Sequence, residues 1–128
     1  MLQQTPVMRV LPVFGDWLRR WPAPADLAAD SPAVAIRAWG RLGYPRRAVR
    51  LHAAATAITV EHDGVVPDSV DTLLGLPGIG EYTARAVAAF AFGARTPVVD
   101  TNVRRVLSRV VRAATNPANL RPPRTAPR

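Results

Sequence analysis

Apolar residues recur at helical spacing along most of this chain, and this periodicity is the strongest limit on its fold. In the first such segment they are Val7, Val10, Leu11, Phe14, Trp17, Leu18 and Trp21. Similar stripes occupy residues 45–61, 81–92 and 103–111, and no stretch alternates long enough with the period of two that a half-buried strand requires. Amphipathic helices of this kind bury their apolar faces against one another. The pattern predicts an all-α domain of about six helices.

Proline, glycine and capping residues predict where these helices begin and end. Thr5, just before Pro6, is the expected N-cap of the first helix, and residues 22–24 (Pro-Ala-Pro) are expected to close it. Asp68 is the expected N-cap of a short helix that precedes residue 76. Residues 1–113 are expected to form one domain, and residues 114–128, rich in Pro, Asn and Arg, to form a disordered tail.

Composition limits the kinds of site that the chain can build. It contains no cysteine, so disulfides and cysteine-held zinc or iron–sulfur sites are excluded within it. His52 and His62 share no metal-ligand spacing, and we expect no metal site. No apolar run is long enough to span a membrane, and residues 1–10 lack the features of a secretory signal. We therefore expect a cytoplasmic protein.

The charge is strongly basic and comes from one residue type. The net charge is +8, and all seventeen basic residues are arginine. An arginine excess suits contact with a polyanion such as a phosphate backbone, and a merely solvated basic surface is the open alternative. With no lysine, the chain has no Schiff-base nucleophile apart from its N-terminal amine.

The stretch LPGIGEYTARAV, residues 76–87, interrupts the helical pattern with a Gly-x-Gly turn. Without a Cβ at Gly78 or Gly80, a phosphate oxygen can approach the backbone N–H groups at the start of the next helix. Such a turn can bind the phosphates of a nucleic acid independently of the base sequence. An ordinary turn between two helices is the alternative.

A second constellation, PVVDTNVRR at residues 97–105, places Asp100 at the N-cap of the last helix. Helix capping alone explains an aspartate there. Backbone donors at a helix start also favour the carboxylate anion, which can stabilise an oxocarbenium-like transition state beside a bound sugar. Both roles are compatible.

Several motifs, in this order, resemble the helix-hairpin-helix DNA glycosylases, and among them the MutY-type adenine DNA glycosylases. They are MLQQTP, WGRLGYPRRAVRLHAAA, LPGIGEYTARAVAAFAFG and PVVDTNVRRVLSR, spread over residues 1 to about 111. The resemblance implies a helix-hairpin-helix glycosylase core, a six-helix barrel. It also implies hydrolysis of the N-glycosidic bond of adenine mispaired with 8-oxoguanine or guanine, by a monomer acting on double-stranded DNA at the nucleoid.

The resemblance further implies roles for three catalytic residues. Asp100 matches the aspartate that stabilises the cationic sugar. Tyr82 stands where the lyase members of the superfamily carry a Schiff-base lysine, so a monofunctional glycosylase is expected. Asn102 matches an asparagine that orients the aspartate and the substrate.

Contacts to DNA follow from the same resemblance. Gln3 and Gln4 match glutamines that probe the duplex where adenine leaves the stack, and Tyr44 matches an aromatic wedge beside 8-oxoguanine. Without the family, the glutamines are solvated end residues and Tyr44 packs over a turn. The residues expected to contact DNA are Gln3, Gln4, Tyr44, Arg47, Pro77, Gly78 and Gly80.

The chain departs from the MutY pattern at both ends. Those enzymes carry a general-acid glutamate just before MLQQT, and beyond the last helix a four-cysteine [4Fe-4S] loop and a domain that recognises 8-oxoguanine. Here Met1 begins the motif, and the residues after Ala114 supply neither feature. We expect a truncated core of marginal stability without a cofactor, and a DNA-binding fragment without catalysis is the alternative.

Overall fold

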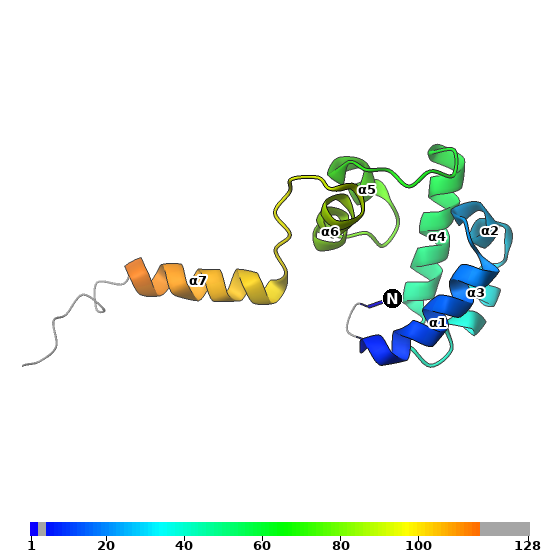
Figure 1. Ribbon diagram of the computed structural model, residues 1–128, viewed down its shortest axis with the longest axis horizontal. Helices are drawn as coiled ribbons and strands as arrows, with labels where there is room; N and C mark the ends of the chain where they lie inside the picture. The colour runs from blue at the N-terminus through cyan, green and yellow to red at the C-terminus, as the bar shows by residue number, and fades with distance from the viewer. Residues whose placement is uncertain (3–4, 116–128) are drawn as a thin grey trace, which may run out of the picture. The chain divides into compact units, whose positions relative to one another are not determined.

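The computed structural model of this chain describes residues 1–2 and 5–115, which form helices and no strand. The all-α prediction is confirmed. The helices, shown in Figure 1, are α1 (Val7–Arg20), α2 (Pro24–Ala29), α3 (Pro32–Trp39), α4 (Arg46–Glu61), α5 (Val70–Gly75), α6 (Glu81–Phe92) and α7 (Thr101–Thr115). None of these described helices is long and apolar enough to cross a membrane.

The chain divides into two compact units. The first, Met1–Thr96, contains α1 to α6, and the second begins at Pro97 and contains α7. That residues 1–113 form one domain stays a prediction. Of the predicted tail, residues 114 and 115 belong to α7, and residues 116–128 lie outside the described residues.

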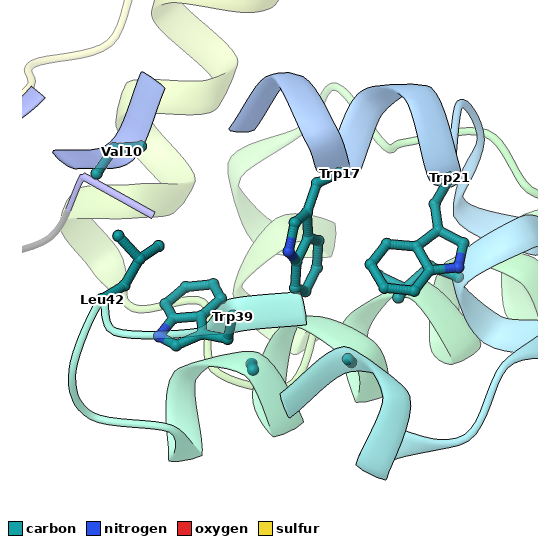
Figure 2. Close-up of a cluster of buried hydrophobic side chains, with 9 residues drawn as sticks. Val10, Trp17, Trp21, Trp39 and Leu42 are labelled. Carbon is teal, nitrogen blue, oxygen red and sulfur yellow. The ribbon is translucent and has the colours of Figure 1, made fainter. Parts of the chain in front are cut away.

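Three tryptophans form the centre of the core made by α1, α2, α3 and α4 (Figure 2). Trp17 of α1 packs edge-to-face against Trp21 at 4.7 Å and against Trp39 of α3 at 5.7 Å between ring centroids. Such pairs add about 0.5–1.5 kcal/mol each beyond the area they bury. The three indole N–H groups donate to Ala38 O at 3.0 Å, Asp30 Oδ2 at 2.8 Å and Gly43 O at 2.9 Å, respectively. The rings are therefore fixed in orientation as well as buried.

Helix α2 is the element that the sequence analysis missed. Residues 22–24 do more than close α1, because Pro24 takes the first position of α2, where its missing N–H has no helical acceptor in any case. The Ala23 N–H donates to Asp26 Oδ2 at 2.9 Å, and Leu27 is buried in the core. Six residues with one buried anchor show no detectable periodicity.

Two predicted N-caps are wrong by one residue. The N-cap of α1 is Pro6 and not Thr5, because Thr5 is buried and its Oγ1 accepts from Arg47 Nη2 at 2.9 Å. The N-cap of α5 is Ser69 and not Asp68, and its Oγ accepts from the Thr72 N–H at 3.1 Å. Tertiary contacts and local hydroxyl geometry thus decide between neighbouring candidates.

Helices α5 and α6 pack against each other and form a second apolar cluster with the end of α4. Its buried members are Ile58, Leu73, Leu76, Ala84 and Ala88. Ala84 and Ala88 lie one turn apart and are fully buried, so α6 approaches its neighbours closely. This packing fixes the connection between α5 and α6 relative to α4.

Candidate nucleic-acid interface

The connection between α5 and α6, residues 76–80, is a tight turn anchored at its start. Leu76 is buried, and the Ile79 N–H donates to Leu76 O at 3.1 Å. Gly78 has a φ of +78°, a conformation that L side chains rarely adopt, so any other residue there is strained. Pro77 and Gly78 are exposed at the tip. The predicted hairpin is present, and its phosphate contact stays a prediction.

The N-cap residue of α6 offers no side chain to the first backbone N–H groups of this helix. Its N-cap is Gly80, and the first N–H groups of a helix have no acceptor within that helix. A Cβ added at Gly80 would meet no atom within 4 Å, so the approach to this end is open. The helix dipole also places partial positive charge here. The geometry therefore suits an anion.

An open hollow of about 530 Å³ lies at this turn. Its lining residues are Arg50, Gly78, Ile79, Gly80, Glu81, Tyr82 and Thr83. Tyr82, a predicted catalytic residue, is 48% exposed beside it. The one acid of the lining, Glu81, accepts from Arg85 Nη2 at 3.2 Å, so its charge is compensated within α6. Among the lining residues, Arg50 is the cation.

Tyr44 is held outward by the turn between α3 and α4. Its φ is +50°, which is uncommon for a residue other than glycine, and its side chain is 69% exposed. Backbone strain of this kind persists where surrounding contacts impose it, and it is common at binding sites. This exposure agrees better with an aromatic that contacts a partner than with one packed over the turn. Its role as a wedge stays a prediction.

Arg47 points into the protein, although the sequence suggested a DNA contact. Besides Thr5, Nη2 donates to Leu42 O and Gly43 O, each at 3.3 Å. The guanidinium carbon lies 5.2 Å from the Trp39 ring centroid and 5.6 Å from that of Tyr44. Burial, and then the charge of Arg47, lowers the pKa of the N-terminal amine. Through its hydrogen bonds to Leu42 and Gly43, Arg47 thus stabilises the turn that carries Tyr44. A direct DNA contact by Arg47 stays a prediction.

Helix α4 links the Tyr44 turn to the hollow. Tyr44 lies two residues before α4 begins, and Arg50 lies in its second turn against Gly78. At about 1.5 Å of rise per residue, Arg50 lies about 6 Å along the helix from the first residue of α4, Arg46. From the sequence, Arg50 is grouped with Arg46 and Arg47 beside Tyr44 as an expected phosphate contact, but its packing on Gly78 is not predicted, because that contact joins residues that are far apart in the chain.

Asp100 and Asn102 belong to the second unit. The Asp100 carboxylate caps α7 as expected, because Oδ1 accepts from the Val103 N–H at 2.6 Å. The Arg104 N–H donates to Asp100 O at 2.9 Å. Asp100 is half-buried and Asn102 is exposed. The predicted cap is confirmed, and the catalytic roles of both residues stay predictions.

Gln3 and Gln4 lie outside the described residues, so the duplex contacts predicted for them have no structural description. In the described part of the chain, no three His, Asp or Glu side chains are grouped to hold a metal ion. The [4Fe-4S] cluster of the MutY-type enzymes needs thiolates, and this chain contains no cysteine. The residues present therefore do not fit that cluster.

Comparison with known protein families and sequences gives strong matches. The family described as "HhH-GPD superfamily base excision DNA repair protein" matches residues 1–121. The chain is 62% identical over 122 residues to the adenine DNA glycosylase of Mycolicibacterium smegmatis, covering 94% of this chain and 42% of that protein. It is 42% identical over 120 residues to the human adenine DNA glycosylase, covering 93% of this chain and 22% of that protein. The chain thus spans less than half the length of these relatives.

Solved structures with the same helical arrangement also match. An endonuclease III trapped in a covalent intermediate with DNA has a TM-score of 0.75 and 28% identity, covering 82% of this chain and 50% of that one. A thermostable thymine-DNA glycosylase has a TM-score of 0.76 and 27% identity, covering 83% of this chain and 49% of that one.

Proposed function

The chain belongs to the HhH-GPD superfamily of base excision DNA repair proteins, and on that premise we propose that it is an adenine DNA glycosylase. Its substrate is a duplex in which adenine is mispaired with 8-oxoguanine or guanine, and its product is an abasic site. The observation that carries this proposal is the Asp100 carboxylate held at the start of α7. A protein that only binds DNA needs the hairpin alone, whereas this carboxylate, besides capping α7, can stabilise a cationic sugar.

DNA contact begins at the hairpin and the start of α6. The backbone N–H groups beyond Gly80 donate hydrogen bonds to a phosphodiester, while Tyr44 enters the duplex near the mispair. Because α4 connects these two positions, one stretch of duplex reaches both. The glycosidic bond is buried in the base stack, so adenine leaves the duplex before the bond breaks.

The reaction is a hydrolysis at the anomeric carbon. The bond between C1′ and the adenine nitrogen breaks, and its electron pair leaves with the base, which takes up a proton. The Asp100 carboxylate stabilises the cationic sugar, and Asn102 orients Asp100. Water then adds to C1′ and releases a proton to solvent, which balances the proton that the base takes up from solvent. With Tyr82 beside the hollow and no lysine in the chain, a lysine Schiff base cannot form, so the activity is monofunctional.

The proposed partner is double-stranded DNA, bound by a monomer. The same proposal places the protein with chromosomal DNA. The arginine-only charge of +8 favours this association and makes it sensitive to salt.

Single-turnover adenine release from a duplex with one 8-oxoguanine·adenine pair tests the proposal. Asp100→Asn keeps an oxygen that can cap α7 but removes the charge, so release should fall by about 10²- to 10³-fold while binding persists. A duplex in which cytosine replaces the adenine is the control. Wild-type binding without release would refute the enzyme and leave a DNA-binding module. Wild-type release that survives in Asp100→Asn would refute the role of the carboxylate.

A further inference from the structure

The side chain of Arg50 lies directly on the backbone of the hairpin. A Cβ added at Gly78 would stand 2.7 Å from Arg50 Cβ, 3.0 Å from Cδ and 3.2 Å from Cγ. The first distance is shorter than real Cβ contacts and the other two are tighter than most of them, so the space that Gly78 leaves empty holds the stem of Arg50. Gly78 is therefore needed twice, for its positive φ and for this contact.

The charged end of Arg50 has no hydrogen-bond or ion-pair partner among residues 1–2 and 5–115. Arg50 is exposed and lines the hollow with Gly78, Ile79 and the first turn of α6. No described residue forms a hydrogen bond or ion pair with it, whereas Arg85 and Arg47 are both engaged. The nearby carboxylate of Glu81 is paired with Arg85. The lining of the hollow thus combines backbone donors with one uncompensated guanidinium.

We propose that Arg50 binds the DNA phosphate that the hairpin holds, so that α4 and the hairpin grip one phosphodiester together. This inference rests on the proposed function and adds a residue to its DNA site. A guanidinium can donate two parallel hydrogen bonds to phosphate oxygens. Its stem is already packed on Gly78, so less side-chain freedom is lost when the phosphate arrives. The contact is to the backbone and is therefore independent of base sequence.

The salt dependence of binding to an undamaged duplex tests the contact. Arg50→Met keeps an apolar stem and removes the charge. The slope of log K against log salt is negative, and the substitution should reduce its magnitude by about 0.9. This corresponds to roughly eightfold weaker binding near 0.1 M salt. The loss should be equal for unrelated sequences. Arg37→Met, at an exposed position of α3, is the control and should keep both slope and affinity.

A double-mutant cycle shows whether Gly78 places Arg50. Gly78→Ala forces a Cβ onto the Arg50 stem and should weaken binding in the wild-type background more than in the Arg50→Met background. Tryptophan fluorescence confirms that each variant is folded. Additive losses would overturn the pairing of Gly78 with Arg50. Unchanged slope and affinity in Arg50→Met, with a wild type that binds, would overturn the phosphate contact alone. A folded wild type that binds no duplex would overturn this inference and the proposed function together.

Discussion

At the scale of single residues, substitution of Arg47 tests whether this arginine stabilises the fold or is an ordinary surface residue. Arg47→Met is expected to lower the free energy of unfolding of the first unit by about 2 kcal/mol, since its charged hydrogen bonds to Thr5, Leu42 and Gly43 are lost. Urea unfolding followed by tryptophan fluorescence measures the change. Arg46→Met, at an exposed neighbouring position, should stay within about 0.5 kcal/mol of the wild type. Equal effects of the two substitutions would show that Arg47 is an ordinary surface arginine.

The same residues show what a sequence can predict about a site. The sequence correctly placed Asp100 as a helix cap and Gly78 in a turn, because both depend on the few residues around them. It did not separate Arg47 from Arg50. One side chain turns inward because Thr5 and Trp39 come to lie beside it, and the other lies on Gly78. These contacts join residues that are far apart in the chain, so the local sequence pattern does not predict them.

At the scale of elements, α5 depends on its N-cap. A six-residue helix is too short to be stable by itself, so the hydrogen bond from the Thr72 N–H to Ser69 Oγ matters. Ser69→Ala should lower the free energy of unfolding by about 1 kcal/mol and speed amide exchange at Leu73 and Leu76. Asp68→Ala, which removes the cap that the sequence suggested, should cost less than about 0.5 kcal/mol. The reverse order of the two variants would contradict the observed cap.

Helix length also explains which elements the sequence reveals. The helices α1, α4 and α6 carry apolar stripes over several turns, and each is found where it is predicted. The six residues of α2 contain one buried side chain, so α2 is stabilised mainly by packing on α4 and shows no period of its own. Pro24, the first residue of α2, is equally consistent in the sequence with the end of α1.

At the scale of the whole molecule, the two units differ in how their apolar side chains are placed. The first buries its three tryptophans in a core, although it also exposes apolar side chains such as Met8 and Phe90, whereas every large aliphatic side chain of α7 is exposed. Those of α7 are Val103, Val106, Leu107, Val110 and Val111, which are 45% to 59% exposed. An exposed stripe of this kind binds other apolar surfaces and promotes aggregation.

Replacing Val106, Leu107 and Val110 by glutamine should reduce hydrophobic-dye binding and light scattering and leave the unfolding midpoint of the first unit unchanged. The exposed side chains lose little buried area, and glutamine is at least as good a helix former as valine. Trp17, Trp21 and Trp39 all lie in the first unit, so their fluorescence reports on that unit alone. Trp39→Ala is the contrasting control, because Trp39 is 2% exposed and its loss should cost about 3–5 kcal/mol. A clear fall of the tryptophan-monitored midpoint in the glutamine variant would show that the α7 stripe stabilises the first unit.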